Sequence, residues 1–138
     1  YDLNNSHVIP ALIRKFFEAK KNNLNKVQIW GTGSPLREFL HVDDLADACF
    51  YLILNYSDIG FVNVGSGIEI SIKDLATLIK RLTEFEGQIE FDSTKPDGTP
   101  RKLMDNGKLM KMNWQPKFSL ELGLAEVIKS YPFVKNMS

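Results

Sequence analysis

The sequence predicts an α/β domain, and three observations support this prediction. Segments with apolar residues at helical spacing alternate with short segments of strand-like composition along all 138 residues. Apolar residues make up 43% of the chain, enough to bury a core in one domain of this length. A free-standing doubly wound domain normally opens with a strand and a glycine-rich phosphate loop, and this sequence does not, so we expect an α/β domain of another kind.

Composition and charge exclude several classes of function. Lys plus Arg and Asp plus Glu each number 17, so there is no net field that attracts nucleic acid or an anionic membrane, and we expect neither as a partner. Cys49 is the single cysteine, which excludes an internal disulfide and a multi-cysteine zinc site and fits a reducing compartment. No apolar run approaches the roughly 20 residues that span a bilayer. We therefore expect a cytoplasmic protein.

The first element is a predicted helix. Asn5 or Ser6 can cap it, and the pattern indicates that it ends within residues 20–23. His7 would lie in the first turn, where the positive pole of the helix dipole disfavours the imidazolium and keeps the ring neutral at about neutral pH. The apolar stripe consists of Ile9, Leu12, Ile13 and Phe16.

Next, a hairpin is predicted. Residues 26–30 and 37–42 have strand-like composition and flank a turn over residues 31–35, Gly-Thr-Gly-Ser-Pro. The hairpin would bring Trp30 and Arg37 together at one end. An indole plane beside a guanidinium suits a ligand with a planar base or sugar face and a phosphate. The alternative to ligand binding is a purely structural role, in which Trp30 fills the core and Arg37 is solvated.

The following helix is predicted to begin with Asp43 as its cap. Its apolar positions have the spacing of a buried stripe, and they are Leu45, Ala48, Cys49, Leu52 and Ile53. Cys49 lies inside this stripe, so we expect a packed, inert thiol. His41 follows the strand and precedes the cap, which favours a structural hydrogen bond over a chemical role.

Strands and helices then alternate. Residues 60–65 and 88–92 are predicted strands. Between them, Ser71 and Asp74 have the spacing of a capping box and begin a helix. The core face of this helix is Ile72, Leu75, Ile79 and Leu82.

The last part of the chain begins with a polar loop over residues 92–102, which two prolines stiffen. A short helix is predicted over 106–112, and Ser119 caps a final helix that Pro132 ends or bends. Three cations of the loop are solvated unless it folds back over the cavity beside Trp30, namely Lys95, Arg101 and Lys102.

Several well-known motifs are missing from the sequence. The glycine pairs in 31–33 and 65–67 lack the third glycine of a dinucleotide fingerprint, and we expect turns at both. His7 and His41 stand too far apart to predict a shared metal, so we expect no metal site. There is neither a Gly-x-Ser-x-Gly elbow nor a Tyr-x-x-x-Lys pair. From the residues alone, the chain offers ligand-binding groups and at most one acid/base candidate.

Five segments in combination resemble a known family. They are residues 6–15 (SHVIPALIRK), 30–33 (WGTG), 37–46 (REFLHVDDLA), 62–65 (VNVG) and 95–102 (KPDGTPRK). Together they are similar to the C-terminal, substrate-binding part of the GDP-L-fucose synthases, which are extended short-chain dehydrogenases. The segment 37–46 alone is typical of the wider group of nucleotide-sugar enzymes. Segments 6–15 and 95–102 narrow the resemblance to the GDP-L-fucose synthases.

The resemblance implies roles for six residues. His7 matches the histidine that donates or accepts a proton in the epimerisations at C3 and C5, close to NADP. Lys15 stands where some members have Arg, so a bidentate grip is lost there. Five residues match positions that hold the GDP-sugar, namely Lys15, Trp30 as the planar contact, Arg37, Asp97 and Lys102.

The resemblance also implies an activity for the whole enzyme. It uses NADPH, and no metal, to epimerise and reduce GDP-4-keto-6-deoxy-D-mannose to GDP-L-fucose, and it is a homodimer. The NADPH loop, the Ser/Tyr/Lys reduction triad and a partner cysteine, to which Cys49 does not correspond, belong to an N-terminal Rossmann domain that is absent here. We therefore expect residues 1–138 to be a substrate-binding domain, a fragment of a longer chain that is inactive alone.

An exposed apolar surface is a further expectation. In extended dehydrogenases the chain crosses between the two regions more than once, so parts of this chain would pack on the N-terminal region. We expect an apolar patch to be exposed here and to drive self-association.

Two alternative functions stay open. The chain is also compatible with the substrate domain of another nucleotide-sugar epimerase or dehydratase. A non-catalytic nucleotide-sugar-binding module is the third hypothesis.

Overall fold

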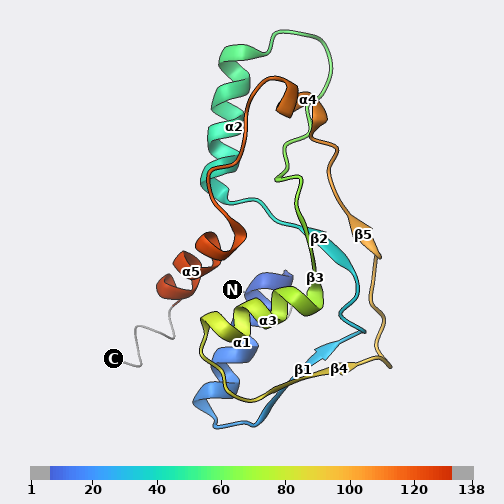
Figure 1. The fold of residues 1–138 in the computed structure, drawn as a ribbon, viewed down its shortest axis with the longest axis vertical. Coiled ribbons are helices and arrows are strands. Elements are labelled where there is room, and N and C mark those ends of the chain that lie inside the picture. The colour runs from blue at the N-terminus through green and yellow to red at the C-terminus, as the bar shows by residue number, and fades with distance from the viewer. Residues whose placement is uncertain (1–6, 132–138) are drawn as a thin grey trace.

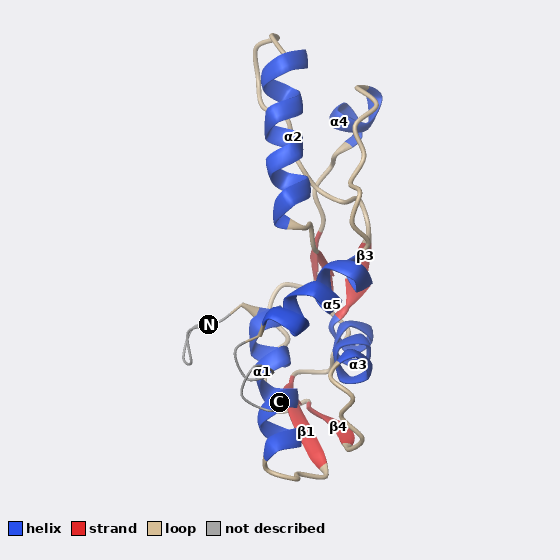
Figure 2. Cartoon of the chain, turned by 90° about the vertical axis from the view of Figure 1, so that its left-hand side faces the viewer, coloured by secondary structure: helices blue, strands red, loops and turns tan. Residues whose placement is uncertain are grey.

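A computed structural model describes residues 7–131. The described chain is elongated, with α1, α3, β1 and β4 at one end, α2 and α4 at the other, and a small sheet between them (Figures 1 and 2). The elements follow as α1 (Val8–Lys21), β1 (Lys26–Trp30), β2 (Leu36–Glu38), α2 (Val42–Asn55), β3 (Glu69–Ser71), α3 (Ile72–Leu82), β4 (Gln88–Asp92), β5 (Arg101–Lys102), α4 (Gly107–Lys111) and α5 (Leu120–Ser130). This arrangement confirms the predicted α/β class.

The main core lies where α1, α3 and α5 pack around β1 and β4. The predicted stripes of α1 and α3 supply its centre, and Ile13, Phe16, Leu75 and Ile79 are fully buried. Aromatic contacts extend the core, since the ring of Phe16 lies 5.6 Å from that of Phe85. Helical periodicity therefore identified both faces correctly.

The predicted hairpin is wrong. β1 pairs with β4 in parallel, whereas β2 pairs antiparallel with β3 and parallel with β5 in a second sheet. The linker at 31–35 is tied to the start of α3 instead, because the N–H groups of Ile72 and Lys73 donate to the carbonyls of Pro35 and Gly33. Gly33 also packs directly on the Phe91 ring, where a Cβ would not fit.

Two helix starts differ from the prediction by one or two residues. α1 begins at Val8, so His7 is the N-cap residue and does not lie in the first turn. Asn5 and Ser6, the predicted caps, lie outside the described residues. α2 begins at Val42 after His41, whose Nδ1 accepts the N–H of Asp43. The predicted cap at Asp43 is therefore wrong, and the predicted structural role of His41 is confirmed.

The other helix starts match the prediction. Ser71 caps α3, since its Oγ accepts the N–H of Asp74 and donates to the carboxylate of the same residue. Ser119 caps α5 by accepting the N–H of Leu122. α5 ends at Ser130, and Pro132 lies outside the described residues.

The predicted strands beyond the hairpin are half right. β4 occupies residues 88–92 as predicted. Residues 60–65 form no strand, and the third strand in the chain is β3, a few residues later. β5 falls inside the predicted polar loop, where only its pairing with β2 defines it as a strand.

The packing of α2 contradicts the predicted stripe. Ala48 is buried, in a small second cluster with Leu109 and Trp114, but Cys49 is exposed. The expected packed thiol is therefore wrong. The apolar residues on the opposite side of the helix face solvent, and we call this set the α2 apolar face: Leu45, Cys49, Phe50, Ile53 and Leu54. The expected exposed apolar surface is thus present.

None of the described helices is long and apolar enough to cross a membrane.

Candidate functional site

A hollow of about 300 Å³ lies between α1, the end of β1, β2 and the loop that follows β4. Four of the residues predicted to bind a substrate line it together, although they come from four separate segments. The lining consists of Val8, Ala11, Leu12, Lys15, Ile29, Trp30, Arg37, Ile72 and Asp97. Trp30, Arg37 and Lys15 therefore converge on one hollow, although no hairpin produces this and Lys102, which was expected to share the hollow, does not line it.

Lys15 reaches the hollow from the second turn of α1. Its Nζ donates to the carbonyl of Gln28, at 2.9 Å, so the side chain is held against β1. Partial burial and, to a smaller extent, the neighbouring charge of Arg14 lower the pKa of the Lys15 ammonium. The site thus holds a cation that is only partly solvated.

Trp30 lies at the carboxyl end of β1 and does not fill the core. The residue is 65% exposed, and the Nζ of Lys95 lies 5.7 Å from the ring centroid. A cation at this distance is attracted by the ring. The indole therefore presents a flat, accessible surface at the edge of the hollow.

Arg37 belongs to β2 and lies beside the polar loop. Its Nη1 donates to the carbonyl of Leu36, and a Cβ on Gly98 would lie 4.0 Å from its Nη2. Lys102 is the register partner of Arg37 in the parallel β2–β5 pair, so both side chains leave the same face of the sheet. Lys102 is exposed and is not among the described residues that line the hollow.

Asp97 fastens the loop to the turn that follows β1. Its two carboxylate oxygens accept the N–H and the hydroxyl of Thr32, at 2.6 and 2.8 Å. Gly31 has a φ of +84° and lies so close to Asp97 that a Cβ would overlap the carboxylate. The loop therefore folds back over the site, and the Asp97 carboxylate already holds this turn.

His7 lies at the start of α1 and is exposed. It is two turns before Lys15, about 12 Å away along the helix axis. It does not line the hollow, and its ring makes no capping bond within the described part of the chain. An acid or base at this position would act at the far end of a ligand whose anionic part lies at Lys15.

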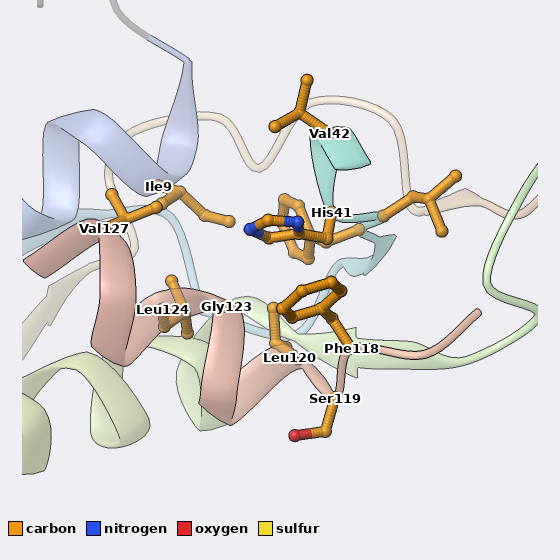
Figure 3. Close-up of a pocket in the computed structure, with 11 residues that line it drawn as sticks. Ile9, His41, Val42, Phe118, Ser119, Leu120, Gly123, Leu124 and Val127 are labelled. Carbon is orange, nitrogen blue, oxygen red and sulfur yellow. The ribbon is translucent and has the colours of Figure 1, made fainter. Parts of the chain in front are cut away.

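His41 lines a separate apolar hollow of about 210 Å³ with residues of α5 (Figure 3). Its ring stacks on Phe118 with centroids 4.2 Å apart, and its Nε2 lies 3.9 Å from a carboxylate oxygen of Glu126. Across residues 7–131, no cluster of His, Cys, Asp and Glu side chains could hold a metal ion.

Sequence reasoning missed two carboxylates behind the site. Glu38 accepts the N–H groups of Gly67 and Met104, and Glu69 accepts two bonds from Arg101. The Arg101 guanidinium lowers the pKa of Glu69, and the carboxylate raises the pKa of Arg101. The alternation of Arg37 and Glu38 along β2 was the available signal, since it places them on opposite faces.

Comparisons with known proteins give one consistent result. The model of the NAD dependent epimerase/dehydratase family matches residues 1–65. A GDP-L-fucose synthase of Sinorhizobium fredii is 51% identical over 138 residues, which are all of this chain and 43% of that protein. GDP-L-fucose synthase 1 of Arabidopsis thaliana is 58% identical over 127 residues, which are 92% of this chain and 39% of that protein.

A solved structure gives the same result. The GDP-L-fucose synthetase of Naegleria fowleri bound to NADP is 28% identical, with a TM-score of 0.88 over 99% of this chain and 43% of that one. The chain therefore spans about two-fifths of the length of these relatives.

Proposed function

We propose that this chain, which is 58% and 51% identical to two GDP-L-fucose synthases over at least nine-tenths of its length, is the GDP-sugar-binding, C-terminal domain of such an enzyme. The longer protein would convert GDP-4-keto-6-deoxy-D-mannose to GDP-L-fucose with NADPH. One observation carries the proposal: Lys15, Trp30 and Arg37 line one hollow.

We assign the diphosphate to Lys15 and Arg37, with Lys102 beside them, because cations and an anionic ligand attract each other most strongly where water is partly excluded. Trp30 offers its exposed ring to a planar or apolar face of the ligand. Asp97 acts on this substrate chiefly through the turn that it holds, since Thr32 occupies both of its oxygens.

We assign proton transfer at C3 and C5 to His7. Its distance from Lys15 along α1 supports this role, because the sugar ring and the diphosphate lie at different places along an extended GDP-sugar. A neutral imidazole can donate or accept a proton at about neutral pH. As an N-cap residue the ring is exposed, as a group that meets a substrate must be.

NADPH supplies the hydride in the proposed reduction. The Gly-Thr-Gly turn does not offer a cradle for its diphosphate, because the Thr32 N–H is already taken by the Asp97 carboxylate. We therefore propose that NADPH binds mainly to an N-terminal region of the longer protein, with His7 close to it.

We also propose that the longer protein is a cytoplasmic homodimer that binds no nucleic acid. The balance of 17 basic and 17 acidic residues supports the last point. Sedimentation of the longer protein, with and without added DNA, would contradict the proposal if it showed a monomer or a DNA complex. Cell fractionation would contradict the assigned compartment if the protein sedimented with membranes.

The binding role is tested by titrating the chain with GDP, UDP and dTDP in a calorimeter. We expect GDP to bind most tightly and Arg37→Ala to weaken it by about tenfold, which is the loss of one charge-assisted contact. Tighter binding of UDP or dTDP would favour another nucleotide-sugar enzyme. If GDP does not bind, the proposed function is wrong.

The role of His7 is tested in a longer protein that also carries the reduction site. We expect His7→Gln to abolish exchange of the substrate C3 and C5 protons with solvent while GDP affinity is unchanged. Exchange at the parent rate would remove His7 from the mechanism. If the parent itself showed no exchange and no turnover, the chain would instead be a binding module.

A further inference from the structure

Glu38 and Glu69 face each other directly across the antiparallel β2–β3 pair. Like charges at such positions destabilise a sheet. Both carboxylates are bonded to the segment that contains β5: Glu69 accepts two bonds from Arg101, at 2.7 and 2.6 Å, and Glu38 accepts the Met104 N–H at 2.9 Å. Glu38 also accepts the Gly67 N–H at 2.6 Å. We call Glu38 and Glu69 the carboxylate clamp.

The clamp contacts the chain on both sides of Lys102. Arg101 precedes this lysine directly and Met104 follows two residues later, so the contacts of the clamp bracket it in the chain. β5 pairs with β2 over only two residues, which gives this segment a short ladder of its own. Beside the backbone bond from the Leu36 N–H to the Pro100 carbonyl, the clamp therefore supplies side-chain anchors before and after Lys102.

We propose that the carboxylate clamp is a pair of positioning residues that places Lys102 beside Arg37 for binding of a nucleoside diphosphate. This inference rests on the proposed function. Arg37 and Lys102 are register partners and leave one face of the sheet, whereas Glu38 and Glu69 lie on the opposite face. The clamp acts from behind the sheet and does not touch the ligand.

A purely electrostatic role and a positioning role of Glu38 predict opposite changes in GDP affinity, which makes the clamp testable. A carboxylate near an anionic ligand repels it, so by Coulomb's law alone Glu38→Gln strengthens GDP binding. If Glu38 positions Lys102, the same substitution weakens binding, because the amide places an N–H donor against the N–H of Met104 or Gly67.

The experiment measures the GDP affinity of Glu38→Gln by calorimetry. We expect binding to weaken by about tenfold, as for a lost hydrogen bond to a charged group. Glu90→Gln is the matched control: it removes the same charge from an exposed pair with Lys26 in the β1–β4 sheet, does not touch β5, and should change affinity by less than about twofold.

A double-mutant cycle separates positioning from general damage. In a Lys102→Ala background, Glu38→Gln should cause no further loss of GDP affinity, because its effect passes through Lys102. An equal loss in both backgrounds, or unchanged or tighter binding by Glu38→Gln alone, would overturn the proposal.

Hydrogen exchange gives a readout that needs no ligand. Glu38→Gln should speed exchange of the Met104 amide, and Glu90→Gln should not. If the unsubstituted chain binds no GDP, the proposed function is wrong. Hydrogen exchange then tests separately whether Glu38 holds the segment, and unchanged exchange at Met104 refutes the clamp.

Discussion

Lys15 carries a charge in a place that disfavours it. Burial against β1 and the neighbouring Arg14 both lower its pKa, while its bond to the Gln28 carbonyl fixes where the ammonium lies. Such a lysine is well placed to receive an anion, because a bound diphosphate replaces the lost hydration and restores the balance of charge. The same environment makes its contribution depend on pH.

As the pH rises, GDP affinity should therefore begin to fall at a lower pH than it would if Lys15 were an ordinary exposed lysine. An exposed lysine titrates at about pH 10.4, and the lowered pKa of Lys15 means that its charge is lost below that value. Lys15→Arg keeps its charge throughout, so we expect its affinity to decline less between about pH 7 and about pH 9.5. Calorimetric titrations of both proteins with GDP at each pH measure this.

The ratio of the two affinities at each pH removes the titration of GDP itself. Lys108→Arg, on α4 at the other end of the molecule, is the matched control and should follow the unsubstituted protein. Parallel loss of affinity in all three proteins would show that Lys15 does not carry the effect.

At this scale the sequence predicted the kinds of side chain better than their partners. Trp30 and Arg37 do share a hollow, and each is recognisable by its chemistry. Lys102 reaches Arg37, and Met104 reaches Glu38, through the pairing of β2 with β5, across more than sixty residues of sequence. Nothing local encodes that register, because an alternating pattern specifies faces and not neighbours.

Among the elements, α2 is joined to the approach to α5 by one buried carboxylate. Asp44 is 1% exposed, and its two oxygens accept the N–H groups of Lys117 and Phe118, at 2.9 and 3.0 Å. Buried donors that lose their acceptor cost more than an average hydrogen bond contributes. This link therefore matters more to the fold than its two bonds suggest.

Asp44→Asn should lower the free energy of unfolding by about 2 kcal/mol, because the amide nitrogen would face an N–H donor. Asp43→Asn is the control, since this exposed neighbour in the first turn of α2 should change it by no more than about 0.5 kcal/mol. Urea unfolding followed by circular dichroism measures both. Equal midpoints for the two variants would mean that Asp44 does not join these elements.

The failed hairpin has a physical explanation at the same scale. β1 and β2 are separated by a short segment rich in turn residues, which is the usual signature of a hairpin. Here the carbonyls of Gly33 and Pro35 accept bonds from the start of α3, and the strands turn to different sheets. Local turn chemistry was correctly recognised, but its hydrogen-bond partners lie about forty residues away and are not visible in a local pattern.

The whole molecule exposes one helix face that its own described residues do not cover. The α2 apolar face lies away from the second cluster, and its central residues Phe50 and Ile53 are 64% and 78% exposed. α2 extends from the small sheet in the middle of the molecule to one of its ends (Figure 2). The apolar stripe of this helix was predicted from the sequence to be buried, and this prediction is wrong for Leu45, Cys49 and Ile53, because the stripe and the packed side are offset around the helix axis.

We predict that the isolated chain self-associates through this face, because contiguous exposed apolar surface favours association in water. Sedimentation should show a weight-average mass that rises with concentration, and Ile53→Glu should abolish the rise because a carboxylate is costly to bury. Leu122→Glu, at a 60% exposed leucine of α5, is the matched control and should leave association unchanged.

The Cys49 thiol, on the α2 apolar face, should react more slowly with a thiol reagent as the protein concentration rises. A mass that stays monomeric at all concentrations, with constant thiol reactivity, would show that exposure of this face is tolerated without a partner.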